Sequence, residues 1–187
     1  MSSRIEQDFT FPAAIHYEDS FLLNLYTISL SISVHTDTPR EQQISIDRIE
    51  YLIKYMIQNS IFIDDSLEEQ IIKYAYAGIN VCTMPDEPRD QIIAMILMLK
   101  LNAITEGKIT IVELSLESAL SEGIRYITDL QESTQLFGDM GTWWNSHCIS
   151  LSDYTSTDEE KGNVVKLFDH DDWSKVGLSW KDKTKIA

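Results

Sequence analysis

Few side chains in this 187-residue sequence have the types and spacing that catalysis or metal binding requires. His147 and Cys148 are adjacent, but a thiol nucleophile would also need a second histidine held close to it. The segment DHDDW places carboxylates around His170 in a spacing that matches no zinc or calcium template. We therefore interpret DHDDW as a solvated acidic loop and expect neither a metal site nor a cofactor.

Other catalytic signatures are also missing from the sequence. It contains no P-loop segment, no GxGxxG and no HExxH. A small hydrolase that used His147 and Cys148 would need a formed pocket around them. The histidines all fall in segments that we expect to be arms and loops: His16, His35, His147 and His170. The sequence therefore predicts a protein that is not an enzyme.

Acidic residues outnumber basic ones, with Asp and Glu totalling 30, Lys and Arg 15, and a net charge of −15. So strong a negative field disfavours contact with phosphate backbones, and it permits basic partners or mimicry of a nucleic acid. The two cysteines, Cys82 and Cys148, are far apart, which fits reduced thiols. Because there is no signal-peptide pattern and no apolar run of membrane-spanning length, we expect a cytoplasmic protein.

Three helices are predicted between positions 46 and 106. In the first, Ile46–Asn59, apolar residues recur on one face at helical spacing. The second begins after a capping residue near position 65 and ends near Gly78. The third, Arg89–Glu106, is apolar almost all round, so we expect it to be buried. Gly107 follows it and should take the left-handed conformation of a helix C′ position.

Two strands are predicted after Gly107. KITIVELSL alternates apolar and polar residues with a slip near Glu113 that suggests a β-bulge, and GIRYIT returns as its partner. Three helices followed by a hairpin is the order of a winged helix. We therefore expect an α+β, mostly helical chain with a winged-helix-like core. Its third helix and hairpin carry few cations, so we expect no direct nucleic-acid binding.

The predicted core spans residues 20–130, preceded by an irregular N-terminal arm over 1–19. Residues 131–187 are expected to form an irregular, tryptophan-containing extension and tail. Between Tyr26 and Val34 apolar residues alternate with Ser and Thr, which is typical of a half-buried strand. Asp19 and Ser20 would equally cap a helix beginning at the next residue.

Four tryptophans lie in the predicted extension and tail: Trp143, Trp144, Trp173 and Trp180. One interpretation packs one indole of the adjacent pair inside the protein and the other over a loop. The other makes the pair an anchor for a partner, because aromatic residues dominate interface hot spots. Since a tail rarely has a core of its own to fill, we predict that these tryptophans form a partner interface.

Two segments within Ser45–Ile127 carry a resemblance to a known family. SIDRIEYLIKYMIQNSIF and PDEPRDQIIAMILMLKLNAITEGKITIVELSLESALSEGIRYI resemble the middle component of ABC-three-component systems, in which a helix ends near a Glu-Gly turn and a wing hairpin follows. These small proteins are encoded between an effector and an SMC-like ATPase, as in Lamassu-type anti-phage and anti-plasmid defence. The resemblance implies a helix over Phe21–Val34, and we favour that helix over the alternation.

The resemblance implies a non-catalytic adaptor subunit that bridges an SMC-like ATPase and an effector nuclease in a bacterial antiviral defence complex. The acidic body and the missing catalytic motifs fit this role. An alternative from another class is a phage-encoded acidic inhibitor that mimics DNA and blocks a host nucleic-acid-binding enzyme. Carboxylate placement separates the two, because a mimic should carry its acids in two phosphate-like rows on one face.

Overall fold

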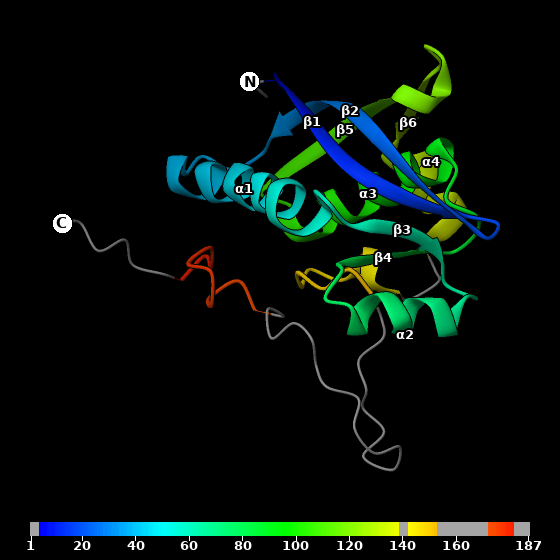
Figure 1. Ribbon diagram of the computed structural model, residues 1–187. Coiled ribbons are helices and arrows are strands. Elements are labelled where there is room, and N and C mark those ends of the chain that lie inside the picture. The colour runs from blue at the N-terminus through cyan, green and yellow to red at the C-terminus, as the bar shows by residue number, and fades with distance from the viewer. Residues whose placement is uncertain (1–3, 139–141, 153–171, 182–187) are drawn as a thin grey trace.

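The computed structural model describes residues 4–138, 142–152 and 172–181. The described strands form a single mixed sheet (Figure 1), and their order across it is β4 (Val81–Met84), β3 (Ile61–Asp64), β1 (Arg4–Tyr17), β2 (Ser20–Val34), β5 (Ile109–Ser118) and β6 (Arg125–Asp129). The mostly helical, winged-helix-like core that the sequence suggested is therefore wrong. The hairpin after the helices does not form a wing, because β5 pairs with β2 and extends the sheet.

The strands β1 and β2 form a long antiparallel hairpin in the middle of the sheet. Phe11 faces Tyr26 across it, and apolar side chains of both strands alternate into the core. The helix that we favoured over Phe21–Val34 is wrong, and the alternation of apolar residues with Ser and Thr correctly indicates a strand. Residues 4–17 also form a strand rather than an irregular arm.

One face of the sheet is covered by α1 (Pro39–Tyr51), by the π-helical segment η1 (Leu52–Ile57) that continues it, and by α3 (Asp90–Thr105). Their apolar residues pack with the inward-facing residues of the strands in one hydrophobic core. The predicted first and third helices are confirmed. Gly107 has the expected left-handed backbone, with a φ of 75°.

A second, smaller core lies beside β3 and β4. Here α2 (Glu68–Tyr76) covers the opposite face of the sheet and packs Ile71 with Ile61, Ile63 and Val81 (Figure 1). Because β1, β3 and β4 run parallel, the intervening helices serve as crossover connections. Neither β3 nor β4 is predicted from the sequence, since a buried run of four residues has no readable periodicity.

The predicted hairpin after Gly107 is confirmed as β5 and β6. The predicted bulge is confirmed as well, because the register of β5 with β2 shifts after Ser31 and leaves Val112 as the extra residue. The remaining short elements are η2 (Ala119–Ser121) between these strands, α4 (Leu130–Phe137) after β6, and η3 (Trp143–Asn145) against α3.

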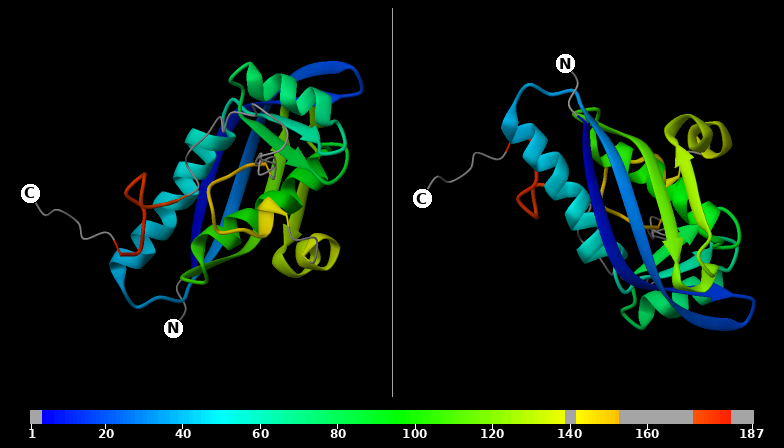
Figure 2. Two further views of the ribbon diagram at one scale, coloured as in Figure 1. Left: turned by 90° about the horizontal axis from the view of Figure 1, so that it is seen from below. Right: turned by 90° about the horizontal axis from the view of Figure 1, so that it is seen from above.

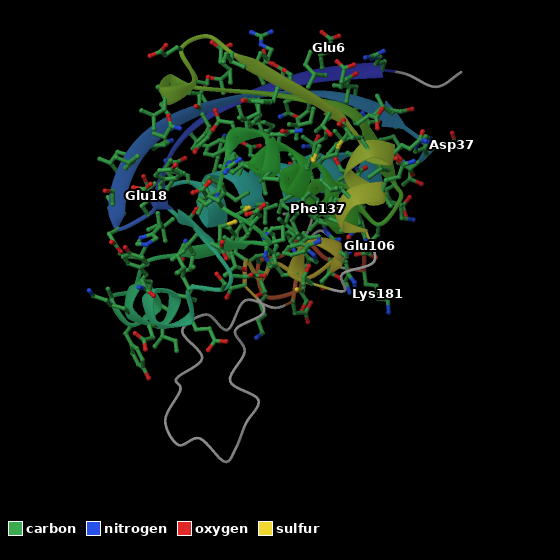
Figure 3. All side chains as sticks on the ribbon, turned by 90° about the vertical axis from the view of Figure 1, so that its right-hand side faces the viewer. Glu6, Glu18, Asp37, Glu106, Phe137 and Lys181 are labelled. Carbon is green, nitrogen blue, oxygen red and sulfur yellow. The ribbon has the colours of Figure 1, made fainter. Side chains whose placement is uncertain are left out.

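No described element covers the other face of β2, β5 and β6 (Figure 2), whereas on β1 α2 packs over the end that carries Ala14 and His16. Small hydroxyl-bearing side chains line β2 on this face, with carboxylates on the neighbouring strands: Glu6, Asp8, Glu113 and Glu117. Figure 3 shows Glu6 on this side, away from the helices. Among the described residues, no helix has the length and apolar character needed to cross a membrane.

Candidate partner-binding surface

The turn of the β1–β2 hairpin carries large apolar side chains into solvent. Tyr17 still pairs with Ser20, so the turn consists of two residues, and Glu18 takes a left-handed backbone with a φ of 51°. Because side chains alternate along a strand, this surface occupies both faces of the hairpin. Its most exposed residue, Leu23, has 76% of its surface accessible. The exposed apolar residues here are Tyr17, Phe21, Leu22, Leu23 and Leu25.

The connection between β5 and β6 lies beside the hairpin and enlarges this surface. Asn24 joins the two, because its Oδ1 accepts hydrogen bonds from the N–H of Leu25 at 2.9 Å and of Leu120 at 3.3 Å. Leu120 and Ile124 are exposed, and together with the five hairpin residues they form what we call the apolar end. More than half of the large apolar side chains that the described residues expose belong to it. Such a concentration marks an interaction site.

A hollow of about 380 Å³ opens between the two halves of the apolar end. The hairpin, the η2–β6 connection and the start of α3 each contribute to its wall. Ile15, Ile124 and Tyr126 make much of this wall apolar, and Asn24 and Asp90 add polar groups. The volume lies at the lower end of the range for ligand pockets, which suits a side chain or another small group.

Asp90 supplies a negative charge to this hollow. Its Oδ2 accepts a hydrogen bond from the Ser118 hydroxyl at 2.6 Å, which ties the first residue of α3 to β5. Burial raises the pKa of Asp90, and the hydrogen bond from Ser118 opposes that rise. The adjacent Arg89 pairs with Glu87 at 2.7 Å. No ion pair to Asp90 occurs among the described residues.

Two buried polar atoms near Asp90 have no hydrogen-bond partner within the described part of the chain: the Nδ2 of Asn24 and the hydroxyl of Tyr26. Burial raises the pKa of Tyr26, the Asn24 amide opposes this, and the charge of Asp90 adds to it. The three groups are therefore within electrostatic reach of one another. Of Asn24 and Tyr26, only Asn24 lines the hollow, so its amide is the group that a ligand there could contact.

Acidic side chains surround the apolar end. Glu18 and Asp19 form the hairpin turn, where Figure 3 shows Glu18 at the bend. Glu122 lines the hollow, and Glu87 lies just before the start of α3. A partner surface that is both apolar and basic would therefore be complementary to this end of the protein.

The structure places Trp143 and Trp144 in the hydrophobic core, where they are 2% and 1% exposed. Their rings meet edge to face, with centroids 5.9 Å apart. Lys100 is fully buried, and its Nζ donates to the carbonyl groups of Trp143, Ser146 and Cys148 at 3.0, 3.0 and 2.6 Å. These contacts fix the segment on α3. A role for the pair in partner binding stays a prediction, but in this conformation neither indole reaches the surface.

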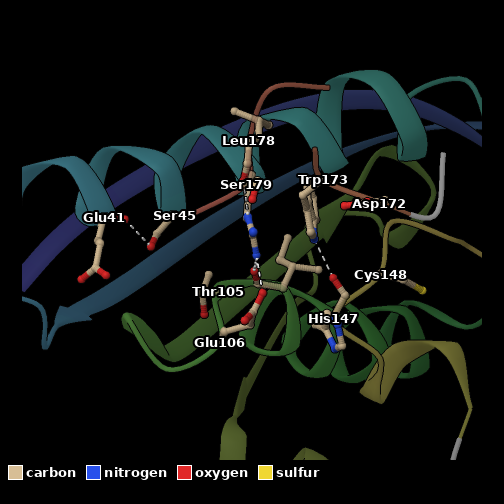
Figure 4. A network of polar contacts seen from close by, with 12 residues as sticks. Glu41, Ser45, Thr105, Glu106, His147, Cys148, Asp172, Trp173, Leu178 and Ser179 are labelled. Carbon is tan, nitrogen blue, oxygen red and sulfur yellow. Dashed lines mark hydrogen bonds and ion pairs between the residues drawn. The ribbon is translucent and has the colours of Figure 1, made fainter. Parts of the chain in front are cut away.

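The other two tryptophans hold the C-terminal segment against α1. The guanidinium of Arg48 lies 4.6 Å from the centre of the Trp173 ring and 3.8 Å from that of Trp180. Its Nε donates to the carbonyl of Leu178 at 2.9 Å, and its Nη1 lies 2.7 Å from the Glu106 carboxylate (Figure 4). Burial alone would raise the pKa of Glu106, but Arg48 holds it below its ordinary value. An interface role for these indoles also stays a prediction.

His147 and Cys148 make contacts within the fold. The carbonyl of His147 accepts a hydrogen bond from the Trp173 indole at 2.6 Å (Figure 4), and the Cys148 sulfur accepts one from the Ser146 hydroxyl at 3.1 Å. Neither residue lines the hollow at the apolar end. The described residues contain no group of three potential metal ligands, and most of DHDDW lies outside them: Asp169, His170 and Asp171.

Sequence reasoning singled out no residue of the apolar end. One signal was present in FLLNL, residues 21–25, where adjacent apolar residues interrupt the alternation that is regular from Tyr26 onward. A strand end with apolar side chains on both faces of the sheet is either covered on both faces or exposed for a partner. The hollow could not be foreseen, because only the sheet pairing brings Asn24, Asp90 and Leu120 together.

Comparison with known proteins supports the fold. No protein-family model and no curated protein matches the chain. Among solved structures, an uncharacterized protein from Wolinella succinogenes has a TM-score of 0.51 at 9% sequence identity, over 69% of this chain and 98% of that chain. At this identity the likeness shows a similar fold and carries nothing about function.

Proposed function

We propose that this protein is a non-catalytic adaptor subunit that binds a partner protein through its apolar end. The observation that carries the proposal is the concentration of exposed large apolar side chains on the hairpin turn and the β5–β6 connection. Because acidic residues surround this surface, we propose that the partner presents a segment that is apolar and basic.

The test introduces charge on the hairpin without disturbing the core. Leu23 and Leu25 are 76% and 48% exposed, so the double variant Leu23→Asp, Leu25→Asp should change the free energy of unfolding by less than about 1 kcal/mol. The same charges should abolish partner binding, since they meet apolar groups of the partner. The tagged full chain would be purified from its host, and its bound proteins identified and quantified by mass spectrometry.

Tyr55→Asp provides a matched control, because Tyr55 is 67% exposed and lies on η1, outside the apolar end. We expect this variant to keep the partners of the wild-type protein. If the hairpin variant keeps the same partners at the same yield, or if both variants lose them equally, the proposed surface is wrong.

The proposed partners remain an SMC-like ATPase and an effector nuclease, on the strength of the sequence resemblance alone. The Glu-Gly turn and the hairpin of that resemblance are present, but they belong to a sheet rather than a wing. Co-expression with the products of neighbouring genes tests the assignment. An SMC-like ATPase that binds the wild-type protein but not the hairpin variant would support it. If no neighbouring gene encodes such an ATPase, the assignment of these partners is wrong, but the proposed docking surface is not affected.

One observation favours the alternative of an acidic nucleic-acid mimic. On the uncovered face, Glu6 and Asp8 on β1 and Glu113 and Glu117 on β5 form two short rows on either side of β2. The rows are about 10 Å apart, because neighbouring strands are about 4.8 Å apart. Each row is short, and Arg125 pairs with Glu117 at 3.1 Å. A mimic predicts that Glu6→Gln, Asp8→Asn releases host partners that the hairpin variant keeps.

A further inference from the structure

We propose that the hollow beside α3 binds a guanidinium or ammonium group, supplied by an arginine or lysine in an apolar segment of the partner protein. Asp90 would act as the counter-ion in the wall of the hollow. The inference rests on the proposed adaptor function, because the partner supplies the cation.

The Asp90 carboxylate is positioned and only partly compensated. Ser118 holds its Oδ2 at 2.6 Å, which fixes the carboxylate in the wall. Burial penalises the charged form and raises the pKa of Asp90. A carboxylate desolvated in this way gains more from an incoming cation than an exposed one does. The nearest arginine in sequence, Arg89, is 2.7 Å from Glu87 and so already has a partner.

A second observation, independent of Asp90, points to a ligand. Asn24 lines the hollow and is 6% exposed, and its Nδ2 makes no hydrogen bond to any described residue. Two backbone N–H groups hold its Oδ1, so the amide cannot rotate to exchange its donor for its acceptor. Behind it lies the fully buried Tyr26, whose pKa the Asn24 amide lowers and which is not part of the wall. The Asn24 amide is therefore the second polar group in the wall that a ligand in the hollow could contact.

The walls suit the stem of a basic side chain. Lysine and arginine bury their methylene groups against apolar surface while the charged group reaches a polar site. The hollow provides such a surface around Asp90, with aromatic rings on which a cation can also rest. These wall residues are Ile15, Tyr17, Pro88, Leu120, Ile124 and Tyr126. Its volume of about 380 Å³ is consistent with one such side chain.

The experiment uses an acetylated and amidated peptide, Leu-Leu-Arg-Leu, and the same peptide with citrulline, a neutral isostere, in place of arginine. Each is titrated into the full chain and followed by NMR. The amide resonances of Leu25 and Leu120 report on the site, since both N–H groups donate to Asn24. We expect the arginine peptide to shift these resonances and to bind about tenfold more tightly than the citrulline peptide.

Two variants separate the role of Asp90 from the general negative charge. Asp90→Asn keeps the shape and an acceptor for Ser118, and it should weaken the arginine peptide about tenfold while leaving the citrulline peptide unchanged. Glu68→Gln removes an exposed charge from the first turn of α2, outside the hollow, and should change both affinities by less than about twofold.

Three outcomes would overturn the inference: equal affinity for the two peptides, no effect of Asp90→Asn, or no binding of either peptide. These failures are distinct from a failure of the proposed function. If the arginine peptide does not bind in the hollow, this inference alone is wrong. Retention of partners by Leu23→Asp, Leu25→Asp refutes the docking surface itself.

Discussion

The C-terminal and hairpin ends of the molecule differ in how far their polar and apolar groups are paired or buried (Figure 1). Beside the C-terminal segment, the buried Arg48 meets a carbonyl, a carboxylate and two indole rings. Lys100 in the interior meets three carbonyl groups. At the apolar end, large apolar side chains lie in solvent, and the Asp90 carboxylate has no ion pair among the described residues.

This difference separates what folds the protein from what it offers to others. Buried cations at the first region are matched by acceptors, so that region is complete without a partner. At the apolar end, a bound partner would bury the exposed apolar side chains and could pair the charge of Asp90. Substitutions near Arg48 and Lys100 should therefore change stability, whereas substitutions at the apolar end should change binding.

Lys100→Met should have the largest effect on stability. Methionine preserves most of the side-chain volume but leaves three carbonyl groups without their donor. We expect the free energy of unfolding to fall by about 3–5 kcal/mol, measured by urea denaturation. Lys54→Met is the matched control, because Lys54 is half exposed and pairs with Glu50 on the helix surface. A loss no larger than that of the control would show that the interior does not depend on the buried ammonium group.

Arg48→Lys should have the next largest effect. Lysine keeps the charge but cannot donate to Leu178, Ile104 and Glu106 in the planar geometry of the guanidinium. We expect a loss of about 2–3 kcal/mol in unfolding free energy together with a change in tryptophan fluorescence. Arg125→Lys, at an exposed pair with Glu117, should cost less than about 1 kcal/mol. Equal losses would contradict the special role of the buried arginine.

Gly107→Val should cost about 1–2 kcal/mol, because a β-branched residue is strained in the left-handed region. A side chain at this glycine would meet no atom within 4 Å, so the cost comes from the backbone. Asparagine tolerates this conformation better, and Gly107→Asn should therefore lose less stability. Thermal unfolding of the two variants provides the comparison, and equal melting temperatures would contradict the backbone explanation.

A smaller effect is expected from the pH dependence of Glu106. Its pKa is held below the ordinary value in the folded protein, so the charged form stabilises the fold at neutral pH. That contribution should be lost as the pH falls through the acid range. The stability advantage of the wild type over Glu106→Gln should accordingly shrink when urea unfolding is repeated from neutral pH to about pH 4. An advantage that is constant or grows toward acid pH would contradict the ion pair with Arg48.

The local helices and strands could be predicted from the sequence better than their arrangement in the sheet. The helix that ends before Gly107 and the bulge near Glu113 follow from backbone preferences and alternation, which act over a few residues. The sheet order could not be read, because pairing of β1 with β3 and of β2 with β5 joins segments far apart in the chain. Pro12 is tolerated within β1, because β3 pairs with β1 only from Ala14 onward.

The candidate site was missed for a related physical reason. The four tryptophans drew attention because aromatic residues anchor interfaces, yet Trp143 and Trp144 fill the core above α3, and the Trp143 carbonyl accepts a hydrogen bond from Lys100. Exposure is a property of the assembled fold, and the sequence does not say which apolar residues remain uncovered. The hairpin turn became visible as a surface only once the sheet showed that nothing described packs over Leu23.

Site-specific photocrosslinking in the native host shows whether the apolar end binds a partner protein. A photoreactive benzoylphenylalanine replaces Leu23 at the apolar end or Tyr55 on η1, which are both highly exposed. After irradiation, each full chain is purified under denaturing conditions and its covalent adducts are identified by mass spectrometry. We expect one dominant protein adduct from position 23 and none of that protein from position 55. The absence of an adduct at position 23, or the same adduct in equal yield at both positions, would contradict this expectation.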